Sequence, residues 1–210
     1  MGHESLETRQ RILKTAIDLF IKFGFKSVSM DDISHKLSMS KKTIYQYFTD
    51  KDEIVNIGVE MRIADEIDKI NKLKTSAANS IDFIVRIDTV LWEHIHQTNP
   101  LTIHNIKKYH STAWRLIENF QNKFLQNCLI ENLAAGIEQK YVRPEVNVEI
   151  LAQLRVDQYV QQLAGHLYPK NKFDLSLVQF TLLDFFVHGF ATENGREVYQ
   201  RILEGNRKVC

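Results

Sequence analysis

Cysteine and proline are both scarce in this chain. Among 210 residues there are two cysteines, Cys128 and Cys210, and three prolines, Pro100, Pro144 and Pro169. Two cysteines this far apart form neither a disulfide framework nor a Cys-x-x-Cys motif, which excludes a disulfide-rich secreted scaffold and a paired-thiol metal site. We therefore expect a reducing, cytoplasmic setting. Because proline interrupts helices, its scarcity also favours long helices.

A large net charge and a long hydrophobic run are missing too. The formal net charge is +1 at pH 7, so the overall charge neither requires nor excludes a nucleic-acid partner, and any basic surface has to be local. The most apolar stretch, 178–190, contains Asp184 and His188 and is shorter than the roughly 20 residues that span a bilayer. The N-terminal residues show no basic region followed by an apolar run, so we expect no export signal, no lipid anchor and no membrane partner.

The motifs of common enzyme active sites are absent as well. The sequence has no His-Glu-x-x-His, no Gly-x-Ser-x-Gly and no phosphate-binding glycine loop. Of its eight histidines, His94 and His96 are two residues apart and would face different sides of a helix. These absences predict that the chain is not an enzyme and that it has no catalytic residues, no metal site and no cofactor.

What the chain does contain is apolar residues at helical spacing. Leu13, Ala16, Ile17 and Phe20 recur at three and four positions and predict a first helix from about Ser5 to Phe23. No segment shows sustained period-two alternation, so the predicted fold class is all-α. Further helices are expected over about 51–73, 81–95, a short stretch after Pro100, 111–141, 148–167, 175–192 and a short tail after Gly195.

Two short helices are predicted between the first helix and residue 50. Ser29, with Asp32 three residues later, is a capping signal for one of them. Ser40 can cap the next, which is expected to continue to Phe48 and to be anchored inward by Ile44 and Phe48. Two short helices separated by about three residues and braced by a preceding helix make a helix-turn-helix unit, which presents its second helix to the DNA major groove.

The predicted helix-turn-helix is locally basic. Between Lys22 and Phe48, five lysines stand against two aspartates, a local excess of three positive charges. Such lysines form either a solvated helix face or a nucleic-acid-binding surface. The neighbouring residues favour the second interpretation. They are Phe20, the Phe23-Gly24-Phe25 turn, Ser29, Ile33, Leu37, Ser40 to Phe48, and Lys51. Through these residues, the stretch from about Ile12 to Val55 resembles the DNA-binding domain of TetR-family regulators.

The resemblance implies a domain division and a set of DNA contacts. It implies an N-terminal three-helix DNA-binding domain at residues 1–50 and a C-terminal helical ligand-binding and dimerisation domain at 51–210. The implied phosphate contacts are Ser29, Tyr45, Tyr47 and Lys51, and the implied groove-facing residues are Lys41, Lys42, Thr43 and Gln46. The sequence departs from the family at Lys42 and Ser38, where the family often has glycine.

The helix that begins at Lys51 is expected to connect the two domains, with Ile54, Ile57, Met61 and Ala64 as its inner stripe. The resemblance further implies that the last two long helices pair with those of a second copy, although an internal core helix is the alternative for the second of them. The residues predicted for this dimer interface are Leu175, Val178, Leu182, Phe185, Phe186 and Gly189.

By family analogy, a ligand cavity is expected among the helices of the C-terminal domain. The residues predicted to line it are Trp92, His96, His104, Trp114, Phe124, Cys128 and Tyr159. Aromatic walls with a few polar groups suit a pocket, but the same residues are equally expected of plain core packing. The predicted function is sequence-specific transcriptional regulation by a homodimer on double-stranded operator DNA, as a repressor released by an unknown small-molecule effector. The alternative is a DNA-binding protein that is constitutive or regulated by a protein partner.

Overall fold

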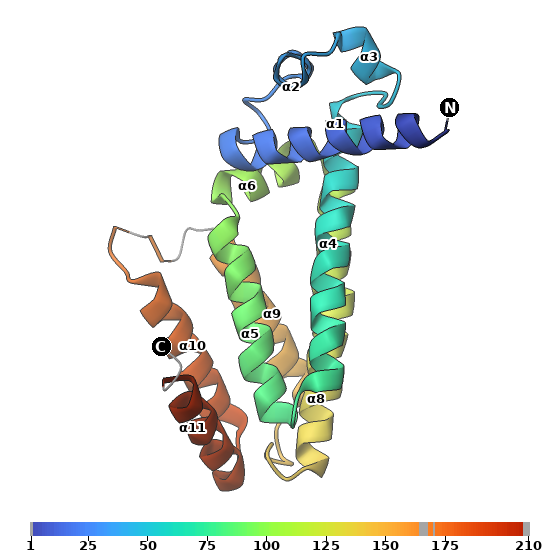
Figure 1. The fold of residues 1–210 in the computed structure, drawn as a ribbon. Coiled ribbons are helices and arrows are strands. Elements are labelled where there is room, and N and C mark those ends of the chain that lie inside the picture. Colours follow the sequence, from blue (N-terminus) through green and yellow to red (C-terminus); the bar gives the residue numbers. More distant parts are fainter. Residues whose placement is uncertain (1, 164–167, 170, 208–210) are drawn as a thin grey trace. The chain divides into compact units, whose positions relative to one another are not determined.

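The structure consists of helices joined by turns and loops, with no β-strand in the part of the chain that it describes (Figure 1). It is a computed structural model that describes residues 2–163, 168–169 and 171–207. About 81% of it is helical, which confirms the all-α prediction. The elements are α1 (Gly2–Phe23), α2 (Met30–Leu37), α3 (Lys41–Tyr45), α4 (Lys51–Ser76), α5 (Ser80–Gln97), α6 (Pro100–Tyr109), α7 (Ser111–Asn119), the π-helical segment η1 (Phe120–Leu125), α8 (Gln126–Glu138), α9 (Val148–Leu163), α10 (Leu175–Phe190) and α11 (Glu193–Arg207).

The chain divides into two compact units. Unit 1 comprises Met1–Asp65 and Thr98–Glu118, and unit 2 comprises Glu66–Gln97 and Asn119–Cys210. Helix α4 therefore begins in unit 1 and ends in unit 2, while α6 folds with the N-terminal helices. The functional boundary predicted at residue 50 stays a prediction, because compactness alone does not define where DNA binding ends.

One buried apolar cluster holds unit 1 together. Its members include Ile12, Ala16 and Phe20 of α1, Ile33 of α2, Ile44 of α3, Phe48, Ile54 of α4, Ile106 of α6 and Ala113 of α7. The three α1 residues are four apart, so they form one stripe along the helix. Helices α2 and α3 are too short to be stable alone in water. Their position therefore depends on this shared core.

Two helix ends in unit 1 show how local chemistry decides where a helix stops. Helix α1 ends at Phe23, as predicted, because Gly24 adopts φ +83° and donates its N–H to the Phe20 carbonyl at 2.8 Å. The prediction that the third helix reaches Phe48 is wrong, since α3 ends at Tyr45. Beyond it the N–H of Tyr47 bonds the Ile44 carbonyl, three residues back, at 3.0 Å. This tighter turn still buries Phe48 completely.

The core of unit 2 lies among α5, α8, α9, α10 and the second half of α4. Its fully buried side chains include Ile70, Ile81, Leu125, Leu129, Leu133, Val156 and Phe190. The single helix predicted over 111–141 is interrupted by η1, where the Gln126 N–H reaches the Gln121 carbonyl, five residues back. Phe120, Gln121 and Leu125 are all buried there. A π-helical turn widens the helix locally and so places these three side chains in the core.

The inner stripe predicted for α4 is partly wrong. Ile54 is fully buried, but Met61 and Ala64 are exposed. The buried positions run instead through Val55, Val59, Glu66 and Ile70. The buried stripe is displaced by about one residue from the predicted stripe. Sequence periodicity does not reveal this displacement, because α4 belongs to unit 1 at its start and to unit 2 at its end.

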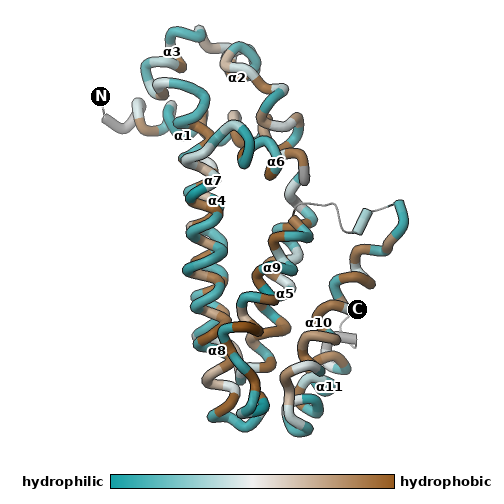
Figure 2. The backbone as a smooth tube through the Cα atoms, turned by 180° about the vertical axis from the view of Figure 1, so that it is seen from behind, coloured by the Kyte–Doolittle hydropathy of each residue, from teal (hydrophilic) through white to brown (hydrophobic). Residues whose placement is uncertain are grey.

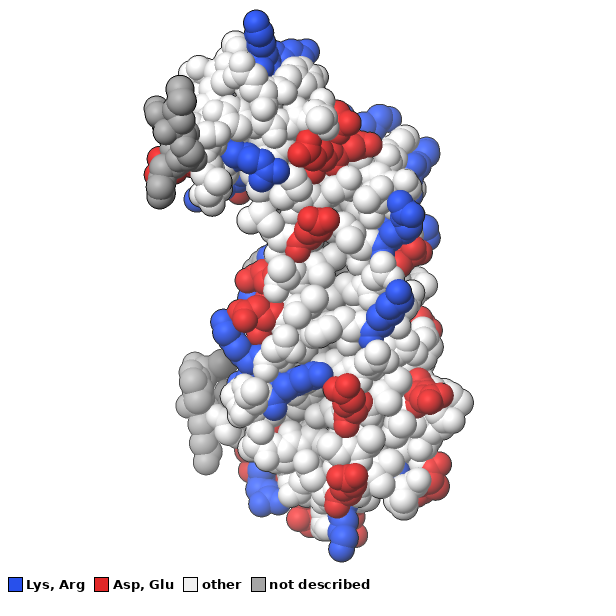
Figure 3. All heavy atoms as spheres, turned by 90° about the vertical axis from the view of Figure 1, so that its right-hand side faces the viewer, with Lys and Arg blue, Asp and Glu red and all other residues white. Residues whose placement is uncertain are grey.

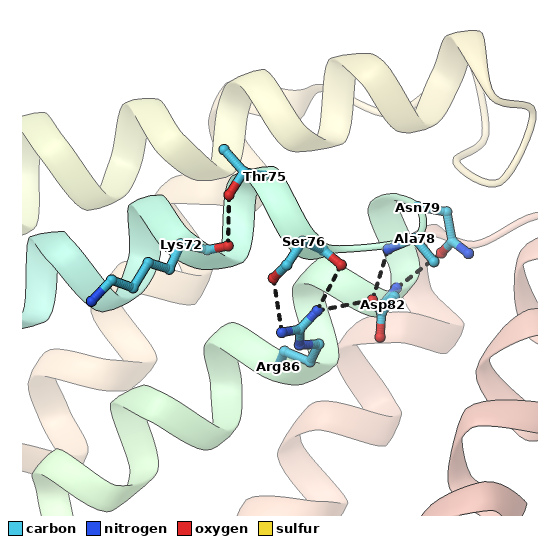
Figure 4. A network of polar contacts seen from close by, with 7 residues as sticks. All are labelled: Lys72, Thr75, Ser76, Ala78, Asn79, Asp82 and Arg86. Carbon is cyan, nitrogen blue, oxygen red and sulfur yellow. Dashed lines mark hydrogen bonds and ion pairs between the residues drawn. The ribbon is translucent and has the colours of Figure 1, made fainter.

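Polar bonds close the turn between α4 and α5, within unit 2 (Figure 4). Arg86 donates to the carbonyl and to the hydroxyl oxygen of Ser76, at 3.1 and 2.9 Å, and contacts Asp82 at 3.5 Å. Asp82 in turn accepts from the Ala78 N–H at 2.9 Å, and its own N–H donates to Asn79 Oδ1 at 3.0 Å. These bonds satisfy backbone groups at a helix end and a helix start, so the turn has a defined geometry.

The remaining helix ends lie close to their predicted places. The helix expected to reach residue 167 is α9, which the structure describes up to Leu163, and 164–167 lie outside the described residues. Helix α10 ends at Phe190, and α11 starts at Glu193, before Gly195. In Figure 2 hydrophobic segments recur along α10. None of the described helices combines the length and the hydropathy needed to span a bilayer.

Candidate nucleic-acid interface

A complete capping box fixes the start of α2. The Ser29 side chain accepts the Asp32 N–H at 3.2 Å, and the Asp32 carboxylate accepts from the Ser29 N–H at 2.7 Å and from its hydroxyl at 2.6 Å. These hydrogen bonds from Ser29 hold the pKa of Asp32 below its usual value. The capping predicted at Ser29 is confirmed, and its hydroxyl proton is already engaged in the cap.

The turn between α2 and α3 depends on Ser38. This residue lies in the left-handed region, with φ 52° and ψ 39°, and its N–H bonds the His35 carbonyl at 3.1 Å. Residues other than glycine rarely adopt this conformation. The turn therefore has the geometry for which glycine is suited, although the chain carries serine there.

Helix α3 presents a polar face outward and an apolar anchor inward. Ser40 caps it by accepting the Thr43 N–H at 3.0 Å, and the two hydroxyl oxygens are 2.7 Å apart. Ile44 is completely buried, whereas Lys41, Lys42, Tyr45 and Gln46 are exposed and Thr43 and Tyr47 are half-buried. Buried Ile44 and Phe48 thus leave the polar side chains of α3 on the outside.

Lys41 is not isolated on this face. Its Nζ lies 2.9 Å from Asp31 Oδ2, so an ion pair links the start of α3 to the start of α2. The hydrogen bond from Lys41 to Asp31 raises the pKa of Lys41 above its usual value. Figure 3 shows basic side chains at the end of unit 1 that carries α2 and α3, and both signs of charge mixed over the rest of that face.

Lys51, the first residue of α4, has a different environment. Its Nζ donates to the Phe25 carbonyl and lies 5.7 Å from the centroid of the Phe20 ring. Burial lowers the pKa of Lys51, and the charges of Asp52 and Asp32 oppose that shift. Lys51 thereby fastens the start of α4 to the turn after α1. Its role in phosphate binding stays a prediction.

The eight residues predicted to contact DNA therefore come together in unit 1, on or next to α2, α3 and the start of α4. Sequence reasoning missed two features of this surface. The first is the bond between Asp31 and Lys41, which joins residues ten apart and which helical periodicity therefore does not reveal. The second is a contact of Arg9 with Phe48. The Arg9 guanidinium lies 4.9 Å from the centroid of the Phe48 ring and covers that buried side chain from α1.

Unit 2 contains a small hollow of about 10 Å³ between α5 and α9, barely enough for one water molecule. It is lined by Asp88, Leu91, Trp92, Ile95, Arg155, Tyr159 and Gln162. Trp92 and Tyr159 are the two predicted cavity residues that line it. The Tyr159 hydroxyl oxygen is 3.0 Å from His94 Nδ1. Its lining of apolar walls and a few polar groups has the composition of a ligand site, but its volume is far smaller than that of common ligand pockets.

The other predicted cavity residues lie elsewhere. His96 is exposed, although its ring centroid is 4.6 Å from that of Trp92. Phe124 stacks on Phe120 with centroids 5.8 Å apart, and burial raises the pKa of the Cys128 thiol to about 11. His104 and Trp114 belong to unit 1. The structure thus gathers two of the seven predicted residues in one hollow.

Sequence reasoning also missed a buried ion pair at this hollow. Asp88 and Arg155 are both buried and contact each other, and Gln179 of α10 donates to Asp88 Oδ2 at 3.0 Å. Arg155 also donates to Gln158 at 2.9 Å and lies 5.3 Å from the centroid of the Phe186 ring. Burial lowers the pKa of Arg155 to about 10. The described residues contain no group of three or more metal-ligating side chains.

The residues predicted for a dimer interface divide between two environments. Phe185 is 75% exposed and Gly189 is exposed, but Val178 and Phe186 face the core of unit 2. Leu175 and Leu182 are half-buried. Further exposed apolar side chains that the prediction omitted are Leu177 and Phe180 of α10 and Ile150 and Leu154 of α9.

The sequence profile described as "Bacterial regulatory proteins, tetR family" matches residues 12–56, which span the helix-turn-helix. Residues 12–56 are therefore a TetR-family DNA-binding domain. This TetR-family protein is a helix-turn-helix transcriptional regulator, which confirms the family named from the sequence. It is 25% identical over 187 residues to the uncharacterized HTH-type transcriptional regulator YvaF of Bacillus subtilis (strain 168), covering 88% of this chain and 96% of YvaF.

Two solved structures show that the fold of this TetR-family regulator extends beyond the helix-turn-helix. A putative transcriptional regulator from Saccharomonospora viridis in complex with choline matches with a TM-score of 0.76 at 19% identity, covering 89% of this chain and 99% of that one. The transcriptional regulator FadR from Bacillus subtilis in complex with stearoyl-CoA matches with a TM-score of 0.66 at 17% identity, covering 86% and 98%. At such identities the likeness shows the fold alone.

Proposed function

We propose that this chain is a ligand-responsive repressor that binds a pseudo-palindromic operator as a homodimer. The observation that carries the proposal is the face of α3, where Lys41, Lys42 and Gln46 are exposed opposite the buried Ile44. A helix held in this way by its apolar side can enter the major groove, where side chains read base edges.

Individual roles follow from the chemistry of the exposed side chains. Gln46 can pair with adenine through its amide, and Lys42 can donate to the guanine acceptors. Tyr45 and Tyr47 can donate their hydroxyl protons to phosphates. Lys51 already donates to the Phe25 carbonyl, and its ammonium group has further N–H donors that can reach a phosphate. We therefore assign base reading to Lys42 and Gln46 first.

Dimerisation is supported by the exposed apolar side chains of α9 and α10. Leu177 and Phe185 lie on α10 and Ile150 and Leu154 on α9, each at least 46% exposed. Soluble monomers rarely leave such apolar patches uncovered. Pairing of α9 and α10 with a second copy would bury them in a four-helix bundle, and two recognition helices would then meet half-sites about 34 to 36 Å apart.

Effector response is supported by the lining of the hollow between α5 and α9, where apolar side chains and a few polar groups lie side by side. Solved proteins of this fold were obtained with choline and with stearoyl-CoA, so ligands of different chemistry are compatible with the fold. A ligand that prefers one state of the protein by about 1 to 3 kcal/mol would alter operator affinity roughly 5- to 150-fold. Helix α4 runs from unit 1 into unit 2 and is the covalent route for this coupling. We expect the repressor to act in the cytoplasm.

The size of the hollow favours one alternative enough to test it. About 10 Å³, barely the space of one water molecule, is far below the roughly 300–1,000 Å³ of common ligand pockets, as expected if the protein is constitutive or answers to a protein partner. Thermal melting with a panel of hydrophobic and cationic small molecules separates the two proposals. Ligand-dependent stabilisation supports an effector site, whereas a melting temperature unchanged by every compound supports the alternative.

DNA binding is tested by selecting bound duplexes from a random pool with wild type and Gln46→Ala. Wild type should enrich a pseudo-palindromic sequence, and Gln46→Ala should lose preference at one position per half-site, at a cost of about 1–3 kcal/mol. Unchanged preference in the variant would remove Gln46 from the reading surface. A wild-type protein that ignores every duplex at low ionic strength, with its helices intact by circular dichroism, would contradict the proposal.

A further inference from the structure

Two adjacent aspartates at the start of α2, Asp31 and Asp32, have different hydrogen-bond partners. Asp32 closes the capping box with Ser29. Asp31 takes no part in that cap through its side chain, and its carboxylate bonds Lys41 of α3 at 2.9 Å instead. Both members of this pair remain substantially exposed, with 58% of the Asp31 side chain and 48% of the Lys41 side chain accessible. The pair therefore lies on the surface that would face DNA.

An exposed ion pair of this kind contributes little to folding stability, because solvent screens the attraction between its charges. Its effect on DNA binding is larger, because binding to DNA of any sequence depends on cations that neutralise phosphates and release counterions. A lysine already compensated by a carboxylate at 2.9 Å contributes little to that process. Lys42, its exposed neighbour on α3, carries its charge without such a bond to Asp31.

We propose that Asp31 is a positioning residue for DNA recognition, because its bond to Lys41 keeps this cation from binding phosphates of any sequence and directs it along the start of α3. This inference rests on the proposed operator binding. The ammonium group has three N–H donors, so Lys41 can keep its bond to Asp31 and still donate to a base edge in the groove. A phosphate that approaches Lys41 instead meets the negative charge of Asp31 beside it, which repels the phosphate and compensates the cation.

The experiment is a double-mutant cycle read by salt dependence. Fluorescence anisotropy with a random-sequence duplex, between 50 and 200 mM salt, compares wild type, Asp31→Asn, Lys41→Ala and Asp31→Asn/Lys41→Ala. Asp18→Asn, at an exposed position of α1, is the matched control for loss of one negative charge elsewhere in unit 1. Circular dichroism checks that each variant keeps its helices.

Asp31→Asn should bind the random duplex more tightly than wild type, with a log–log salt slope more negative by about 0.9, as one additional phosphate contact requires. Its advantage over wild type should therefore shrink about 3.5-fold between 50 and 200 mM salt. The gain should disappear in the Lys41→Ala background, and Asp18→Asn should leave the slope at its wild-type value.

Three results would overturn the inference. The slope of Asp31→Asn could equal that of wild type. The gain could be equally large without Lys41, which would make Asp31 a simple repulsive charge. Asp18→Asn could reproduce the gain, which would make it an effect of net charge. A wild-type protein that binds no duplex at all would contradict the proposed function itself, and this outcome is distinct from the other three.

Discussion

The buried pair of Asp88 and Arg155 allows a stability prediction with a defined size. Both side chains are buried, and Asp88 has two partners, Arg155 and Gln179. Substituting Arg155→Met removes the cation but leaves the Asp88 carboxylate in the core with the Gln179 amide alone. Removing one partner of a buried pair typically costs about 3–5 kcal/mol, because the remaining charge is desolvated without compensation.

Urea unfolding followed by circular dichroism measures this cost. With an m-value of about 3 kcal/mol per molar, Arg155→Met should lower the midpoint by about 1 to 1.7 M. The double variant Asp88→Leu/Arg155→Met removes both charges and should recover most of the loss, because replacing a buried pair by apolar groups is often neutral or stabilising. All variants are compared at one protein concentration, since dimer formation makes stability concentration-dependent.

The reasoning would be refuted in either of two ways. If Arg155→Met lowers the midpoint by no more than an exposed substitution does, water reaches Asp88. If the double variant is as unstable as the single one, the substitution removes packing of the Arg155 stem on Phe186 and not charge compensation.

Three further predictions concern other parts of the chain. Ser38→Gly should stabilise the protein by about 0.5–1 kcal/mol, because it relieves a left-handed serine at some cost in backbone entropy; an unchanged or lower urea midpoint would contradict it. Phe185→Glu should convert the proposed dimer to a monomer in size-exclusion chromatography without loss of helix, since Phe185 is 75% exposed. A variant that elutes as wild type does would exclude this face. Burial raises the pKa of Cys128 from 9.0 to about 11, so the folded state holds the thiol proton more tightly and wild type should lose stability as pH rises from about 9 to 11. Cys128→Ala should lose less stability over that range, and parallel stability–pH profiles of the two proteins would contradict the assignment.

The helix-turn-helix could be predicted from sequence because its determinants are local. A capping serine, a following aspartate and apolar residues four apart specify short helices within a few residues of each other, and the structure confirms the capping box at Ser29. The same reasoning misplaced the end of α3, because helical periodicity does not distinguish an α-helix from the tighter turn that also buries Phe48. Periodicity gives the buried face, but backbone hydrogen bonds decide where the helix ends.

The hollow in unit 2 could not be predicted in the same way. Trp92 and Tyr159 were found because aromatic residues are common in pockets, but Phe124 has the same signal and stacks on Phe120 instead. Asp88 and Arg155 carry no sequence signal of burial, since charged residues are usually exposed. Their contact joins α5 to α9 across 67 residues of chain, and only the tertiary fold specifies such a distance.

The same buried pair also bears on which face of α10 remains available to a second copy. Replacing two buried charges by apolar groups is often stabilising, so a buried pair is weak evidence for stability and is better explained by what its geometry specifies. Here Asp88 bonds Gln179, and Arg155 lies over Phe186, so both polar groups contact α10 at fixed positions. A rotation of α10 by one residue, about 100°, would break both contacts, whereas an all-apolar contact would tolerate other rotations. The orientation of α10 that keeps both contacts leaves Leu177 and Phe185 exposed. The buried pair therefore determines which apolar side chains of α10 lie on the surface and are available to a second copy.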